Sequence, residues 1–409
     1  MTLSSFTRRT SRRNSPDDQG HNLTNLLPLP KDEISLLRHA GQSRKWPIKS
    51  QTQQCLDITQ FKNLFQPIRI GAEELSHRIV LAPLTRLRAN KAHVHGDLAV
   101  EYYKQRSSTP GTLLIAEGTI IAAKAGGWDH TPASEVVDAV QAQGCFIYLQ
   151  FAALGRSGNP ELLERDGISK DNFVGASAIS AHPGGAVPRP MTHTDISEYL
   201  KVYATAASNA VLKDDFDGVE IHKGSGTLSG QFLQDVSNQR TDKYGGSIEN
   251  RVRFPLQMVR AVADAIGEDR TAVHILPWDT SSGIRMQDPR PTFAHFVSKL
   301  CALHPGLAYL HVVEPRVSNL LTAEEGPLSE SDSNDFIRNI WAPLPLISAG
   351  GYSRESATEA TEKCDYLIAF GRTYIANPDL PMRFMKNTPL TPYDTSTFYA
   401  PDLGCTWIY

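Results

Sequence analysis

The sequence predicts a closed (β/α)8 barrel, and three observations support that fold class. From Phe61 onward, short apolar runs typical of buried strands alternate with amphipathic helical segments. Eight such runs occur, which is the number of strands in a barrel of this kind. A doubly wound parallel sheet is the main rival, but no G-x-G-x-x-G motif follows the first strand.

The individual elements follow from these patterns. The expected strands span residues 79–83, 112–117, 145–151, 218–222, 272–276, 308–313, 345–349 and 366–370. The expected helices lie near residues 98–105, 196–212, 248–266, 293–303, 335–340 and 355–363. Ser247 and Ser353 are placed to cap the helices that follow them, because a serine hydroxyl accepts a hydrogen bond from a backbone N–H of the first turn.

Composition excludes several classes of protein. The 409 residues are 40% hydrophobic and 21% charged, which is ordinary for a soluble enzyme. The net charge of −3 indicates no general attraction to nucleic acid or to an anionic membrane, and no apolar run reaches the roughly 18 residues of a membrane span. The five cysteines include no CxxC pair, so we expect no zinc or other metal site and a reducing, cytoplasmic compartment.

The first 60 residues differ from the rest of the chain. Arginines at positions 8, 9, 12 and 13 lie among Ser and Thr, and the first acidic residue is Asp17. A disordered N-terminal extension over 1–60 is the main interpretation, and a mitochondrial transit peptide is the alternative. The barrel is expected over 61–400, followed by a C-terminal tail over 401–409.

The longest irregular connection in the expected barrel follows its fourth strand. His222 ends that strand, and roughly 25 residues separate it from the helix capped by Ser247. Compact domains seldom keep so long a loop unless it has a function. Its mixed charges, Arg240 and Asp242 among them, can pair and hold it in one shape. A histidine at the carboxyl end of a barrel strand, beside such a loop, indicates an active site.

Glycines end the last two expected strands. One strand ends in Ala349-Gly350-Gly351 and the next in Gly371-Arg372. In (β/α)8 barrels, phosphate groups bind the loops after strands seven and eight. Glycine lets backbone N–H groups approach a phosphate, and arginine can hold it with two hydrogen bonds. The sequence therefore predicts a phosphate site at these two loops.

Four stretches, in order along the chain, resemble the old yellow enzyme family of FMN-dependent ene-reductases. They are HRIVLAPLTRLRAN (77–90), SNQRTDKYGGSIENRVRF (237–254), GRTYIANPDLP (371–381) and YDTSTFY (393–399). The resemblance extends from about Asn63 to Tyr399 and is nearest to fungal members, many of which act in secondary metabolism. It implies a (β/α)8 barrel, bound FMN, NADPH or NADH as reductant, and a small enone-type substrate. It also shows that the connection between 118 and 145 is shorter than usual in the family.

The resemblance places ten residues at the flavin. The positions after the first strand lie along the isoalloxazine ring of the flavin, and three more positions contact the polar edge of that ring. The glycine-rich loops hold the phosphate of FMN. These residues are Pro83, Leu84, Thr85, Gly118, Gln150, His274, Gly350, Gly351, Gly371 and Arg372.

The substrate side departs from the family pattern. His222 is present, but Ser225 stands where the family has a second His or Asn, and Thr227 where it has the proton-donating Tyr. His274 replaces an arginine that faces the pole of the flavin that becomes negative on reduction. Tyr399 matches an active-site tyrosine, and packing at the C-terminus is its other interpretation.

Two further expectations concern residues near this site. Trp278 and Asp279 follow the fifth strand and are expected to line the pocket, whereas His311, in the middle of the sixth, is expected to be a core histidine with satisfied hydrogen bonds.

Three functions remain open at this point. The first is NAD(P)H-dependent reduction of the C=C bond of an α,β-unsaturated carbonyl compound, with His222 polarising the carbonyl. The second is a redox-neutral isomerase or epimerase, which the loss of the family's proton-donating tyrosine favours. The third is a non-catalytic paralogue, which the short connection favours.

Overall fold

The computed structural model describes residues 63–90, 95–127, 136–224, 226–317 and 332–399. The expected N-terminal extension over 1–60, the expected tail over 401–409 and Ser225 lie outside the described residues. The described barrel lies within the predicted range of 61–400.

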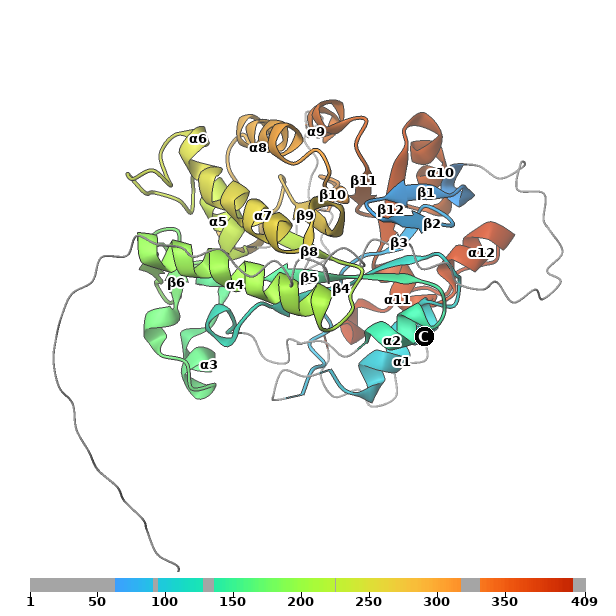
Figure 1. Cartoon of the computed structure of the whole chain (residues 1–409), viewed down its shortest axis with the longest axis horizontal. Helices are drawn as coiled ribbons and strands as arrows, with labels where there is room; N and C mark the ends of the chain where they lie inside the picture. The colour runs from blue at the N-terminus through green and yellow to red at the C-terminus, as the bar shows by residue number, and fades with distance from the viewer. Residues whose placement is uncertain (1–62, 91–94, 128–135, 225, 318–331, 400–409) are drawn as a thin grey trace, which may run out of the picture. The chain divides into compact units, whose positions relative to one another are not determined.

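The core of the structure is a closed barrel of parallel strands in the order β10-β11-β12-β3-β4-β5-β8-β9 (Figure 1). Its strands are β3 (Ile79–Leu81), β4 (Leu113–Ile120), β5 (Phe146–Ala152), β8 (Gly218–Lys223), β9 (Thr271–Ile275), β10 (Tyr309–Val313), β11 (Leu346–Ala349) and β12 (Tyr366–Phe370). The predicted barrel and all eight of its strands are confirmed, with ends shifted by a few residues. Each strand pairs with the next along the chain, as in a (β/α)8 barrel.

Helices connect these strands. They are α1 (Asp97–Arg106), α2 (Val137–Gln141), α4 (His193–Leu212), α6 (Ile248–Arg251), α7 (Arg253–Ile266), α8 (Arg290–Leu303), α9 (Asp335–Trp341), α10 (Arg354–Lys363), α11 (Arg372–Ala376) and α12 (Leu380–Lys386). Helices α4 and α7 pack side by side (Figure 1). The single helix expected over 248–266 is two helices, separated by one turn residue, Val252. Ser247 and Ser353 cap α6 and α10 as predicted.

Smaller elements lie between the main ones. They are β1 (Ile68–Ile70), which pairs antiparallel with β2 (Glu73–Leu75), then α3 (Pro160–Arg165), β6 (Val174–Gly175), β7 (Arg189–Pro190) and α5 (Leu228–Leu233). Of these, α5 matters for the site because it lies in the long connection after β8.

The connection after β8 is held in place by its own charges. Arg240 makes two hydrogen bonds to Asp242, at 3.0 and 2.6 Å, and donates further ones to the carbonyls of Ala176 and Met191. Arg251 donates to the carbonyl of Leu233 at 3.1 Å, at the end of α5. The expected internal pairing is therefore present, and it fixes the segment that follows His222.

The short connection between β4 and β5 closes with one small helix. Helix α2 has five residues, and both Val136, which precedes it, and Val140, within it, are fully buried against the core. The two strands pair in register from Leu113 to Ala116, and the register then shifts before Thr119. This irregularity contains Gly118, which the family resemblance assigns to the flavin.

The last residue of β8 is a buried lysine. Lys223 is 1% exposed, and its Nζ donates to the carbonyl of Pro255 at 3.3 Å and lies 3.6 Å from Met258 Sδ, both on α7. Burial lowers its pKa to about 7. No carboxylate among the described residues forms a salt bridge with it. A charged amine here is costly, because one carbonyl, one thioether sulfur and the face of the Phe296 ring, 5.8 Å away, replace only part of its hydration.

We therefore expect Lys223→Met to stabilise the protein at pH 7, by on the order of 3 kcal/mol in the free energy of unfolding. The unfolded lysine has a pKa of about 10.4. Between pH 7 and 10 the unfolded chain holds a proton that the folded chain lacks, so wild-type stability should rise with pH across this window. The variant should lose that slope and gain most below pH 7. Chemical denaturation at several pH values measures both effects.

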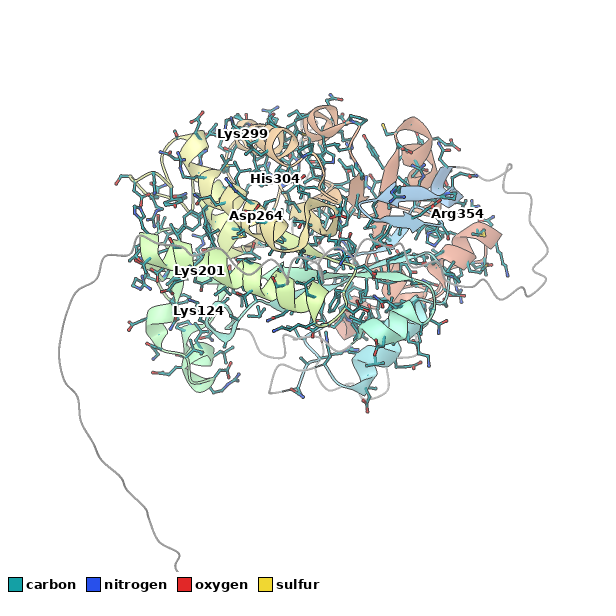
Figure 2. All side chains as sticks on the ribbon, viewed as in Figure 1. Lys124, Lys201, Asp264, Lys299, His304 and Arg354 are labelled. Atoms are coloured by element: carbon teal, nitrogen blue, oxygen red, sulfur yellow. The ribbon has the colours of Figure 1, made fainter. Side chains whose placement is uncertain are left out.

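Lys201→Met is the matched control, because Lys201 is exposed on α4 (Figure 2). It should change stability by less than about 0.5 kcal/mol. If Lys223→Met destabilises the protein at pH 7, or keeps the wild-type slope, the ammonium group of Lys223 is better accommodated than its surroundings indicate.

Candidate active site at the carboxyl ends of the strands

A cavity of about 850 Å³ opens at the carboxyl ends of the barrel strands. Residues from strands far apart in the sequence line it, as expected for an active site of a (β/α)8 barrel. Every described residue of the predicted site lies on its wall: Pro83, Leu84, Thr85, Gly118, Gln150, His222, Thr227, His274, Gly350, Gly351, Gly371, Arg372 and Tyr399. Ser225, also predicted, lies outside the described residues.

One end of the cavity suits a phosphate group. Gly350 and Gly351 have φ of +114° and +68°, a backbone conformation that favours glycine. A Cβ at Gly371 would lie 2.5 Å from Leu84 Cδ1, so a larger residue there would have to displace the end of that side chain. Arg372 follows directly and begins α11. The residues present therefore fit a phosphate held by backbone N–H groups and a guanidinium.

A further part of this end was not predicted from the sequence. Ser353 and Arg354, at the N-terminus of α10, also line the cavity (Figure 2 labels Arg354). The N-terminus of a helix favours an anion, because its first N–H groups have no partner within the helix. The capping role of Ser353 was predicted from the sequence, but its place on the cavity wall was not.

Polar groups meet on another part of the wall. A Cβ at Gly118 would lie 3.4 Å from Gln150 Oε1 and 3.6 Å from Thr85 Oγ1, so these three residues converge. The Nε2 of Gln150 lies 2.7 Å from Glu220 Oε1 and 3.0 Å from His274 Nδ1. Donors and acceptors of this kind suit the polar edge of a heterocycle such as a flavin.

Three histidines stack across adjacent strands. His222, His274 and His311 are in register on β8, β9 and β10. The rings of His222 and His274 are 5.0 Å apart and inclined by 17°, and those of His274 and His311 are 4.1 Å apart and inclined by 20°. Burial lowers the pKa of His222 to about 4 and that of His311 to about 3, and it lowers that of His274 well below its usual value. All three imidazoles are therefore neutral at pH 7.

The expectation for His311 was only half right. Its Nδ1 lies 2.9 Å from Glu220 Oε2 in the core, but its Nε2 has no hydrogen-bond partner among the described residues, and the residue also lines the cavity. Glu220 itself was not predicted. The alternation of β8 carried a signal for it, because residues two apart in a strand face the same side and His222 faces the cavity. Burial raises the pKa of this carboxyl group.

The hydroxyl of Thr227 is turned to the backbone. Thr227 precedes α5, and its Oγ1 donates to the carbonyl oxygen of His222 at 3.1 Å. The hydroxyl of Ser229 reaches the same oxygen at 3.4 Å. The proton of Thr227 is therefore directed at the protein backbone.

The C-terminal part of the described chain contributes another wall. Arg86 Nε donates to the carbonyl of Phe398 at 3.1 Å, and Arg88 Nη2 donates to that of Thr397 at 2.9 Å. These bonds hold Tyr399 at the cavity. Burial raises the pKa of Tyr399, and the charges of Arg372 and Arg86 oppose that rise.

Two expected lining residues lie elsewhere. Trp278 and Asp279 do not border the cavity. Trp278 is buried, with its Nε1 donating to Asn334 Oδ1 at 2.8 Å, and Asp279 Oδ1 accepts from the backbone N–H of Ser281 at 2.9 Å. Trp278 thus faces the segment that contains Asn334, and Asp279 bonds within its own loop, because both residues lie beyond β9, where strand alternation no longer sets the direction of a side chain.

Fold and site together fit a flavin-dependent barrel oxidoreductase, with a candidate phosphate cradle after β11 and β12 and polar groups along one wall. Residues 63–391 match the NADH:flavin oxidoreductase / NADH oxidase family. The chain belongs to this family, to which old yellow enzyme gives its common name, as a fungal-type member. FMN is its cofactor and NAD(P)H its reductant.

Several proteins resemble this chain over most of its length. A chanoclavine-I aldehyde reductase of Penicillium roqueforti is 43% identical, covering 83% of this chain and 93% of its own. A protein of Claviceps fusiformis named as a probable inactive dehydrogenase is 39% identical, covering 83% and 92%. The crystal structure of Old Yellow Enzyme from a Pichia species superposes with a TM-score of 0.74 at 34% identity, covering 83% of this chain and 90% of that one. A morphinone reductase mutant in complex with tetrahydroNAD gives 0.72 at 33%, covering 85% and 97%.

Among the described residues, no helix is both long enough and apolar enough to cross a membrane.

Proposed function

We propose that this oxidoreductase uses NAD(P)H and FMN to reduce the C=C bond of an α,β-unsaturated carbonyl compound. One observation carries the proposal: His222, at the end of β8, lines the same cavity as the phosphate cradle and the polar wall of Gln150 and His274. A carbonyl held by His222 would therefore lie in the same cavity as the cofactor.

Each group has a proposed role toward the flavin. Gly350, Gly351, Gly371 and Arg372 hold the phosphate, helped by the N-terminus of α10. Thr85, Gly118, Gln150 and His274 contact the polar edge of the ring, with Pro83 and Leu84 beside it. The flavin, when bound, supplies hydride transfer.

His222 has the principal role toward the substrate. As a neutral, buried imidazole it can donate a hydrogen bond to the substrate carbonyl and draw electron density from the β-carbon, and Ser225 is a candidate second donor. The fungal relative named as an aldehyde reductase extends the proposed substrates to unsaturated aldehydes. The proposed role of this protein in secondary metabolism rests on its similarity to such fungal relatives.

A redox-neutral reaction is the second candidate. It is favoured by Thr227, whose hydroxyl donates to the carbonyl of His222 and so is not turned to the substrate. An isomerase or epimerase could act without a proton donor at that position, because such a reaction needs only the removal of a hydride from the substrate and its return. A non-catalytic role is a third candidate, since one relative is named as probably inactive.

Flavin binding and reduction test the proposal directly. The purified protein should bind FMN, be bleached by NADPH or NADH without oxygen, and regain its colour with 2-cyclohexenone or an unsaturated aldehyde. If the reduced flavin is not reoxidised by any such acceptor, reductase activity is refuted. Conversion of a substrate with no net consumption of NAD(P)H would support the isomerase instead.

Arg372→Ala should weaken FMN binding by about tenfold to a hundredfold, because the variant loses charge-assisted hydrogen bonds to phosphate. Riboflavin, which lacks the phosphate, should bind both proteins equally. Fluorescence titration of the apoprotein measures both affinities. Arg260→Ala, an exposed change on α7, is the control and should bind FMN as wild type does. Equal FMN affinity in Arg372→Ala would place the phosphate elsewhere.

A further inference from the structure

A chain of hydrogen bonds leads from a buried carboxylate to the cavity wall. Gln150 Nε2 lies 2.7 Å from Glu220 Oε1 and 3.0 Å from His274 Nδ1. Glu220 is fully buried, and His274 and Gln150 are 3% and 4% exposed. The three side chains come from the neighbouring strands β8, β9 and β5, so the backbone holds them in place.

The donors in this chain of hydrogen bonds can be assigned from the chemistry of its three side chains. A carboxylate oxygen accepts hydrogen bonds, so Gln150 turns its NH2 group towards Glu220. The second hydrogen of that NH2 group then points at His274 Nδ1, which must act as an acceptor. A neutral imidazole that accepts at Nδ1 carries its proton on Nε2. That Nε2 atom is buried and has no partner among the described residues, and His274 lines the cavity.

We propose that Glu220, acting through Gln150, fixes His274 as a neutral donor whose Nε2–H serves a hydrogen-bond acceptor of the bound ligand. Glu220 and Gln150 are positioning residues in this scheme. For the identity of that ligand, the inference rests on the proposed function, in which His274 faces the polar edge of the flavin. The cavity would thus offer an uncharged N–H at the position where the family pattern has an arginine.

Protonation of Glu220 does not reverse the assignment when the proton lies on Oε2. That oxygen faces His311 Nδ1 at 2.9 Å, so one proton can be shared between the two atoms. The other oxygen, Oε1, still accepts from Gln150. Only a proton on Oε1 would reverse the orientation of the Gln150 amide, so that its oxygen faced Glu220 and His274. His274 Nδ1 would then be the donor.

The geometry of Glu220, His274 and His311 does not suit a metal ion. Glu220, His274 and His311 offer ligand atoms within 4.8 Å of one another, which is close enough for a metal site. A metal bound to histidine lies close to the plane of the imidazole ring, however, and the two rings are stacked 4.1 Å apart with an angle of only 20°. One ion cannot lie in both planes. The Nδ1 atoms of both rings also already have partners.

Nitrogen-15 NMR of the full chain, labelled at histidine, tests the assignment. The wild-type protein should show His274 as the Nε2–H tautomer at pH 7, identified by loss of its signal in His274→Gln. The tautomer can be read with or without FMN, so failure to bind flavin would refute the proposed function and leave this test intact. A wild-type His274 protonated at Nδ1 would overturn the inference.

Gln150→Glu is the first variant to measure, because it replaces the donor facing His274 with an acceptor of nearly the same shape. His274 Nδ1 should then take a proton. Gln257→Glu is the matched control, since Gln257 on α7 accepts from the Tyr244 hydroxyl and a glutamate can do the same. The control should leave the His274 signal unchanged. An unchanged His274 signal in Gln150→Glu would show that Gln150 does not set the tautomer.

Glu220→Met tests whether the carboxylate of Glu220 sets the orientation of Gln150. Without a carboxylate to orient Gln150, both tautomers of His274 should be populated, and FMN should bind about two- to tenfold more weakly. A His274 that stays entirely Nε2–H in this variant would remove Glu220 from the scheme.

Discussion

Replacing His222 with alanine is expected to lower the turnover of an enone by about a hundredfold while the protein keeps its FMN. His222 is buried at the end of β8, and its Nδ1 has no partner among the described residues. A histidine retained for packing alone would have its buried nitrogens satisfied by the protein. Removal of this donor should therefore act on the carbonyl and leave the barrel intact. Anaerobic stopped-flow oxidation of the reduced flavin by cyclohexenone measures the loss.

The control for this experiment is His222→Asn, which keeps a side-chain donor and should recover part of the rate. Because burial lowers the pKa of His222 to about 4, the imidazole is neutral above that pH. The wild-type rate should therefore show no ionisation of His222 between pH 5 and 8, and a change only as the pH falls towards 4. Loss of flavin and fold together in His222→Ala would instead make the histidine structural.

Much of the fold was predictable because local patterns and the barrel agree. The strand from Gly218 to Lys223 begins with the short run Gly-Val-Glu-Ile and is buried along its whole length, and burial on both faces is what a barrel strand requires. The glycines at 350 and 371 were predicted to hold phosphate because they end strands seven and eight, and phosphate groups bind the loops after these two strands in (β/α)8 barrels. Their left-handed or crowded backbone positions agree with that reasoning.

The parts of the site that were missed depend on contacts between distant segments. The bond from Gln150 to Glu220 joins two strands whose register no single-strand pattern specifies. The direction of Trp278 was mispredicted because it follows β9 in an irregular loop, and its partner Asn334 is far along the chain. The bond from Thr227 to the carbonyl of His222 depends on the short helix α5, which was not predicted from the sequence.

Replacing Thr227 with tyrosine is expected to speed reoxidation of the reduced flavin by simple enones about tenfold or more. A positioned general acid is typically worth roughly 10²–10⁴-fold, and the expected gain is below this range because natural selection has not optimised the position of the introduced phenol. The wild-type threonine cannot supply that acid, since its hydroxyl donates to the carbonyl of His222 and an aliphatic alcohol is a far weaker acid than a phenol.

The structure also indicates that this substitution will be tolerated. Thr227 makes no side-chain capping bond to α5, so that helix loses no cap. The carbonyl of His222 keeps a second donor in Ser229, at 3.4 Å. Thr227 borders a cavity of about 850 Å³, into which a phenol ring can extend.

Thr227→Phe is the matched control, because it adds the same ring without the hydroxyl and separates proton donation from a change in shape. Only Thr227→Tyr should gain rate, and the gain should be largest for acceptors that lack an acidic position of their own. Hydride transfer does not need the new phenol, so FMN content and reduction by NADPH should match wild type in both variants. If wild type already reoxidises quickly and Thr227→Tyr is no faster, protonation does not limit the reaction, and Tyr399 or water supplies the proton.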